Sequence, residues 1–179
     1  GALRGVHPEM VPYLGPRISF DQIVDGTGGP FPPSLAPHGH DYSDEMTIPA
    51  ALQVTPEEMA GYLARYAIPG VYDPVENHGV YQVRDPFHGT ISPGEAIAFV
   101  SPDGLTIVNR AIPGRHMFAG GQVVRTARMN EDGSWTITTR GSGNNYRLFM
   151  DVANTIAGPG IFHEMDRQLL ETIIQDRRK

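Results

Sequence analysis

The sequence contains no cysteine. This absence excludes disulfide bonds, thiolate nucleophiles, and zinc or iron–sulfur centres held by cysteine. Basic residues are also few. The chain has 14 Lys and Arg residues and 20 Asp and Glu residues, which give a formal net charge of -6. Proteins that bind nucleic acid usually carry a basic stripe, so this balance disfavours a nucleic-acid partner.

Long apolar runs are missing as well. A membrane-spanning helix needs about 20 consecutive, mostly apolar residues, and no stretch approaches that length. No signal-peptide pattern is visible. Since 40% of the residues are hydrophobic and only 19% are charged, the chain is expected to be globular rather than disordered, with no membrane span. Its 179 residues suit a single domain.

The first third of the chain is rich in proline, glycine and histidine. The run over residues 26–33 cannot form a helix or a central strand, because proline removes a hydrogen-bond donor and glycine adds backbone entropy. We therefore predict an irregular arm or linker over residues 1–53 and a single α+β domain over residues 54–179. His38 and His40 have the chemistry of metal ligands, but no spacing specifies a further ligand. We interpret this segment as a polar loop and assign it no metal.

A helix is predicted to begin after Thr55. The sequence Thr-Pro-Glu-Glu at residues 55–58 is a capping box with proline at the first helical position. Apolar residues then recur at helical spacing, and Pro69-Gly70 marks the end of this segment.

The middle of the chain is predicted to form β-hairpins. Residues 95–100 and 105–112 flank Ser-Pro-Asp-Gly at 101–104, a sequence that suits a type I turn. Residues 121–129 and 134–140 flank a second turn that ends at Asp132-Gly133. A weaker strand is expected at residues 79–83. Alternating residues from Ser134 to Arg140 indicate a sheet with one covered and one wetter face.

The end of the chain is predicted to be helical. One short helix is expected over residues 148–156 and a longer one from about residue 160, where apolar residues again recur at helical spacing. The fold class is therefore α+β: antiparallel β-hairpins form a sheet, C-terminal helices pack on it, and an irregular Pro/Gly-rich arm precedes them.

Candidate site residues are concentrated between Asn109 and Asn145. A histidine such as His116 can act as an acid or base near neutral pH, and arginine can bind a phosphate or carboxylate through two hydrogen bonds. A glycine-rich turn at a helix N-terminus exposes N–H groups to an anion. The predicted catalytic residues are His116, Arg115 and Arg140. The predicted substrate-binding residues are Arg125, Gly141, Gly143, Asn144 and Asn145. Equally, these residues can be ordinary turn and cap residues.

A second candidate is His88-Gly89-Thr90, which follows an aromatic residue. This triplet resembles the first motif of diphtheria-type ADP-ribosyltransferases. The resemblance implies an NAD-consuming enzyme in which His88 orients the ribose, and adds His88 to the substrate-binding residues.

The motifs over residues 95–170 also resemble C-terminal effector domains of bacterial polymorphic toxins, such as RHS and type VI secretion effectors. They are Asn-x-x-x-Pro-Gly-x-His from Asn109, Gly-Gly-x-Val-x-Arg from Gly120, Thr-x-Gly-x-Gly-Asn from Thr139, and a final helix. The resemblance implies a secreted toxin domain that acts on an anionic substrate in a target cell. It also implies a parent protein upstream of residue 1 and a cognate immunity protein. The alternative is a non-enzymatic binding or structural module of a larger secreted protein. The sequence indicates no particular cofactor and does not decide whether the chain is an enzyme.

Overall fold

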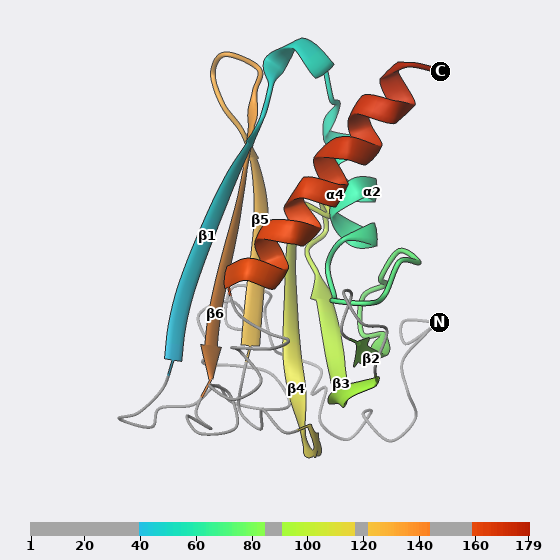
Figure 1. Ribbon diagram of the computed structural model, residues 1–179, viewed down its shortest axis with the longest axis vertical. Coiled ribbons are helices and arrows are strands. Elements are labelled where there is room, and N and C mark those ends of the chain that lie inside the picture. Colours follow the sequence, from blue (N-terminus) through green and yellow to red (C-terminus); the bar gives the residue numbers. More distant parts are fainter. Residues whose placement is uncertain (1–39, 85–90, 117–121, 144–158) are drawn as a thin grey trace.

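The computed structural model describes residues 40–84, 91–116, 122–143 and 159–179. These residues form an antiparallel sheet with helices packed against one face (Figure 1). The strands are β1 (His40–Ile48), β2 (Val80–Arg84), β3 (Ile91–Val100), β4 (Thr106–His116), β5 (Gln122–Met129) and β6 (Trp135–Gly143). The helices are the 3-10 turn η2 (Ala50–Leu52), α2 (Pro56–Arg65) and α4 (Pro159–Arg177).

The strand order β1-β6-β5-β4-β3-β2 brings the first strand beside the last. From β2 to β6, each strand pairs with the next in the chain, as hairpin connections favour. β1 then pairs antiparallel with β6 over its whole length, from His40 opposite Gly143 to Ile48 opposite Trp135. The sheet is therefore continuous from β2 to β6, and β1, which is distant from β6 in the sequence, completes it at the other edge.

Two tight turns that the sequence predicts are present. The N–H of Gly104 donates to the carbonyl of Ser101 over 2.9 Å, and the N–H of Gly133 donates to the carbonyl of Asn130 over 3.0 Å. Both glycines have positive φ, 74° and 87°, which other residues adopt only with strain. The β3–β4 and β5–β6 hairpins are thus confirmed.

The predicted helix after Thr55 is also confirmed. The Thr55 hydroxyl accepts from the Glu58 N–H and the Glu58 carboxylate accepts from the Thr55 N–H, both over 3.1 Å. The helix ends at Arg65 instead of at Pro69-Gly70, the sequence signal that follows it.

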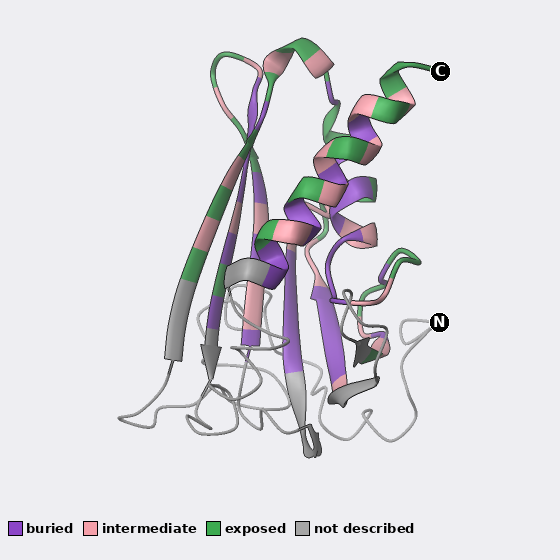
Figure 2. Cartoon of the chain, viewed as in Figure 1, coloured by how far each residue is buried: buried purple, intermediate pink, exposed green. Residues whose placement is uncertain are grey.

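The final helix α4 begins at Pro159, close to the predicted start. Figure 1 shows α4 crossing the sheet diagonally, with α2 beside its C-terminal half. In Figure 2, buried positions line the side of α4 that faces the sheet. The apolar ones are Ile161, Phe162, Met165, Leu169 and Ile173, and Asp166 is buried among them.

The main core lies between α2, the C-terminal half of α4 and the sheet. It includes Met59, Leu63, Leu169, Ile173 and Trp135, and the indole of Trp135 donates to the Val54 carbonyl over 2.9 Å. Each buried Leu or Ile side chain stabilises the fold by roughly 1.5–3 kcal/mol relative to an exposed one. This core fixes α4 on the sheet.

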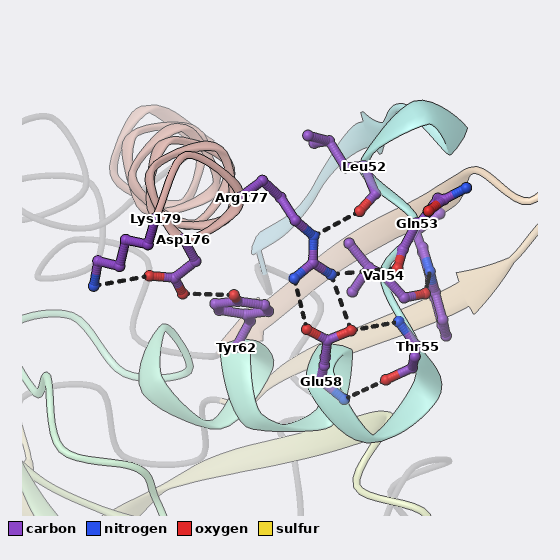
Figure 3. Close-up of polar contacts among 10 residues, drawn as sticks. Leu52, Gln53, Val54, Thr55, Glu58, Tyr62, Asp176, Arg177 and Lys179 are labelled. Carbon is purple, nitrogen blue, oxygen red and sulfur yellow. Dashed lines mark hydrogen bonds and ion pairs between the residues drawn. The ribbon is translucent and has the colours of Figure 1, made fainter.

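Polar contacts also join α2 to α4 (Figure 3). The Arg177 guanidinium donates to both oxygens of Glu58 over 2.8 and 2.9 Å. The Tyr62 hydroxyl donates to the Asp176 carboxylate over 2.6 Å, while burial and this acceptor raise the pKa of Tyr62 to about 12. The C-terminal end of α4 is therefore held by both apolar and charged contacts.

Four sequence predictions need correction or stay outside the described residues. Residues 40–48, assigned to the irregular arm, form β1, because they pair with β6 along their whole length. Gly141 and Gly143, expected in a strand-to-helix turn, lie within β6. The predicted helix over residues 148–156 lies outside the described residues, as does the proline-rich run over 26–33. The division into arm and domain stays a prediction.

The expectation of one covered and one wetter sheet face holds for only part of the sheet. In β6, Thr139 is buried beneath α4, whereas the neighbouring Arg140 is exposed on the other face. In β3 and β4, however, Phe99 and Val108 lie on that other face and are also buried.

No helix in the described part of the chain is long and apolar enough to cross a membrane.

Candidate ligand site beneath the final helix

A row of polar side chains crosses three neighbouring strands on the face that α4 covers. Asp44 of β1 lies opposite Thr139 of β6, and Thr139 lies opposite Arg125 of β5. Because paired residues in an antiparallel sheet point to the same face, these three side chains stand side by side under the helix. α4 adds Asp166, which is fully buried.

Arg125 and Asp166 form a buried ion pair. One guanidinium nitrogen of Arg125, Nη2, lies 2.6 Å from Oδ1 of Asp166, and both side chains have an exposed fraction of 0%. Nη1 donates to the Thr139 hydroxyl over 2.7 Å, and the guanidinium carbon lies 5.6 Å from the centroid of the Phe162 ring. A buried arginine needs such partners, because an uncompensated charge away from water is strongly unfavourable.

The carboxyl group of Asp166 experiences opposing influences. Burial raises its pKa above the ordinary value of 3.8, and Arg125 lowers it by charge and by hydrogen bonding. The charge of Asp44 and its hydrogen-bonding contact raise the pKa of Asp166 again. The net direction is upward, because desolvation is the largest of these influences.

Four buried polar atoms on this face have no hydrogen-bond partner among the described residues. Two are carboxyl oxygens, Oδ2 of Asp44 and Oδ2 of Asp166. The other two are Nε of Arg125, a donor, and Oδ1 of Asn109, an acceptor. The orientation of the Asn109 amide is assigned by its Nδ2, which donates to the Ala67 carbonyl over 3.0 Å. Asn109 lies opposite Val123 while Arg125 lies opposite Ile107, so the two polar residues are diagonal neighbours in β4 and β5. Such neighbours are roughly 7–8 Å apart.

The surroundings of these two atoms are apolar on the helix side. Ile161, Phe162 and Met165 form a small cluster at the start of α4, and Val123 of β5 packs against it. The polar row separates this cluster from the main core, whose next row contains Ile137 and Ala127. A mainly apolar lining with a few convergent polar groups is typical of a small-molecule site.

The described structure places the predicted site residues at several positions in the sheet. Arg125 is buried under α4, whereas Arg140 of β6 is exposed on the opposite face. Arg115 and His116 end β4, where His116 lies opposite Gly94 of β3. Gly141 lies opposite Val123 in the sheet, and Gly143 ends β6 opposite His40. His88, Asn144 and Asn145 lie outside the described residues, so a shared site around His116 stays a prediction.

Sequence reasoning found Arg125 but missed the residues around it. Asp44 falls in the predicted irregular arm, Asp166 in the predicted final helix, and Asn109 at the start of a motif. One signal was present: Asp166 interrupts the apolar stripe between Met165 and Leu169 on the buried side of α4. A carboxylate at such a position requires a buried partner.

The described residues contain no group of three or more His, Cys, Asp or Glu side chains that could hold a metal ion. Within them, Arg125 binds Asp166, and the charge of Asp44 acts on Asp166.

No protein-family model matches the chain, and a search of curated proteins found no match. The chain is similar to several solved structures at low identity. A norcoclaurine synthase point mutant from Thalictrum flavum is 15% identical, with a TM-score of 0.49 and coverage of 78% of this chain and 96% of that one. The Aha1 dimer structure from Colwellia psychrerythraea is 10% identical, with a TM-score of 0.48 and coverage of 75% and 96%. The di-domain ARO/CYC StfQ of the steffimycin biosynthetic pathway is 10% identical, with a TM-score of 0.48 and coverage of 78% and 52%.

These structures correct the prediction of a polymorphic toxin effector. The chain resembles an ARO/CYC protein, a norcoclaurine synthase and Aha1, and not toxin effector domains, so the predicted resemblance and toxin function are wrong. The cognate immunity protein and the secreted parent protein lose their support with it. The physical reason is that the quoted motifs are largely strand residues: Thr139, Gly141 and Gly143 continue β6 and form no anion-binding turn. Secretion was inferred from the same resemblance and stays a prediction.

Proposed function

We propose that this domain is a non-enzymatic binding module for a small, uncharged, largely apolar molecule that carries a hydroxyl group. The ligand would lie between the sheet and the first turns of α4. The observation that carries the proposal is the pair of buried, unpartnered atoms, Nε of Arg125 and Oδ1 of Asn109, on one covered face. A buried polar atom without a partner is unfavourable by roughly 1–3 kcal/mol, so a bound molecule that satisfies both would be stabilised there.

The chemistry of the two atoms selects the polar group. Nε of Arg125 can only donate a hydrogen bond, and Oδ1 of Asn109 can only accept one. A hydroxyl group accepts and donates at once, so one hydroxyl can satisfy both atoms. A carboxylate can satisfy Arg125 but offers nothing to Asn109.

The local charge also disfavours ions. Asp166 already neutralises Arg125, and Asp44 lies beside them. An anionic ligand would meet two carboxyl groups, while a cation would meet the guanidinium. The remaining surface offered by Ile161, Phe162 and Val123 is apolar and suits an aromatic or aliphatic body.

Three probes of one shape test this proposal: 2-naphthol, 2-methylnaphthalene and 2-naphthoate, with binding followed by ligand-observed NMR and thermal shift. We expect 2-naphthol to bind best and 2-naphthoate to bind worst. Asn109→Ala should weaken 2-naphthol by roughly 5- to 20-fold, the value of one hydrogen bond, and leave 2-methylnaphthalene nearly unchanged.

A pair of adjacent valines provides the matched control. Val123→Phe adds bulk on the face under α4, whereas Val124→Phe adds the same bulk on the opposite face of β5. The first variant should abolish probe binding and the second should preserve it, provided that circular dichroism shows both to be folded. Failure of all three probes to bind the wild type, or equal loss in both variants, would reject the site.

A further inference from the structure

Two carboxyl groups meet beneath α4 with no hydrogen donor between them. Oδ2 of Asp166 and Oδ2 of Asp44 are both buried atoms without a hydrogen-bond partner among the described residues. The Asp166 side chain is fully buried and that of Asp44 is 17% exposed. Asp44 lies opposite Thr139, whose hydroxyl accepts from Arg125, and Arg125 binds Asp166, so the two carboxyl groups lie close together. Asp44 raises the pKa of Asp166 by its charge and by a side-chain hydrogen-bonding contact.

The charged groups around the pair do not balance it. From β5, Arg125 supplies one positive charge and binds Oδ1 of Asp166. From α4, the His163 ring nitrogen Nδ1 lies 3.8 Å from Oδ1 of Asp44, but this imidazole is 72% exposed and is charged only when protonated. From β6, Thr139 contributes an uncharged hydroxyl. With both carboxyl groups ionised, the described buried cluster carries one excess negative charge.

We propose that Asp44 and Asp166 form a buried proton-binding site, in which one proton is shared between their Oδ2 atoms and joins β1 to α4. One proton makes one carboxyl a donor to the other, so that both unpartnered oxygens are satisfied at once. It also makes the cluster of Arg125, Asp44 and Asp166 electrically neutral. Two adjacent carboxyl groups that cannot both ionise are a known arrangement for holding a proton.

The shared proton has a structural consequence. Asp44 belongs to β1, and Asp166 belongs to the first half of α4, so the proton links an edge strand to the helix that covers the sheet. Loss of the proton leaves two facing carboxylates and favours separation of the helix from the strand. This inference does not require that any small molecule binds, so it stands or falls independently of the proposed ligand site.

The direct test is to follow the carboxyl carbons of 13C-labelled aspartate by NMR as the pH is changed. In the wild type we expect the Asp166 carboxyl to titrate above its ordinary pKa of 3.8. In Asp44→Asn, the amide supplies a permanent donor to Asp166 and removes the neighbouring charge, so the midpoint of Asp166 should fall.

Glu45→Gln is the matched control. Glu45 follows Asp44 in β1, is exposed on the opposite face, and loses the same unit of charge. It should leave the Asp166 titration unchanged. A wild-type midpoint for Asp166 at or below 3.8 would overturn the inference, whether or not the variants fold. So would a midpoint that is equal in Asp44→Asn and Glu45→Gln.

Stability gives a second readout of the same site. A carboxyl whose pKa is raised by folding stabilises the folded state at low pH, and this contribution is lost as the pH rises from 3.8 through the raised pKa. The unfolding equilibrium constant of the wild type should therefore rise by up to about tenfold per pH unit in that window, relative to Asp44→Asn. Parallel pH profiles of the two proteins would contradict a shared proton.

Discussion

Arg125 of β5 connects three elements on the covered face. It binds Asp166 from α4 and Thr139 from β6, and it is fully buried. Arg125→Leu leaves the Asp166 carboxyl buried without its cation, so we expect a loss of about 3–5 kcal/mol in the free energy of unfolding. Urea denaturation measures this loss directly.

Two further variants give that prediction its controls. Arg128→Leu lies in the same strand but is exposed, and its effect should stay within about 0.5 kcal/mol. The double variant Arg125→Leu with Asp166→Leu removes both charges and should recover most of the lost stability, because buried ion pairs are often replaceable by apolar pairs. Equal losses for the Arg125 and Arg128 variants would show that the buried pair is not important for stability.

Single residues also show why sequence reasoning succeeded only locally. The turn at Gly104 and the cap at Thr55 depend on neighbours within a few positions, and both were predicted correctly. The pairing of Arg125 with Asp166 spans 41 positions, and no local pattern encodes it. Sequence therefore indicated a charged residue in a strand without indicating the helix residue that neutralises it.

Among the elements, the junction of α2 and α4 has its own pH dependence. Glu58 accepts two hydrogen bonds from Arg177 and one from the Thr55 N–H, and these lower the pKa of Glu58 from 4.5 to about 2 (Figure 3). A lowered pKa stabilises the folded state above pH 4.5, and this contribution is lost as the pH falls through about 2. The side chains of Glu58 and Arg177 are 37% and 33% exposed, so solvent and salt weaken the contribution of this ion pair to stability.

The matching experiment compares thermal unfolding of the wild type, Glu58→Gln and Glu57→Gln at pH 6 and pH 2.5. Glu57 lies in the same first turn of α2 but is exposed and serves as the control. Glu58→Gln should lower the midpoint at pH 6, and the difference from the wild type should shrink at pH 2.5 and in high salt. A difference that is the same at both pH values would contradict the role given to the ionised carboxylate.

Elements were predicted well where one local pattern defines them. β2, β5, β6 and α4 appear close to their predicted bounds, because alternation and helical spacing are visible in short windows. β1 was missed because its sequence, His-Asp-Tyr-Ser-Asp-Glu-Met-Thr-Ile, is mostly polar and depends on β6 for its pairing. The polar row of the candidate site includes this strand, so missing β1 also meant missing Asp44.

In the whole molecule, the two halves of α4 differ in their apolar contacts. The C-terminal half joins the main core through Leu169 and Ile173 and is tied to α2 by Arg177 and Asp176. The first turns of α4 belong to the small cluster around Phe162. The buried polar row lies between this cluster and the main core. Regions with fewer apolar contacts open locally at lower free energy.

Hydrogen exchange should therefore show an inverted gradient along the final helix. Backbone amides over residues 163–166 should exchange faster than those over 169–174, although the latter lie nearer the end of the chain, where helices usually fray. Mass spectrometry of overlapping peptides can resolve the two groups.

Leu169→Ala, which truncates a fully buried side chain, should destabilise the protein by about 2–5 kcal/mol and speed exchange mainly over 169–174. Slower exchange over 163–166 than over 169–174 would contradict this prediction. It would mean that the start of α4 opens at a higher free energy than its C-terminal half, and a ligand could not enter there by local opening of the helix.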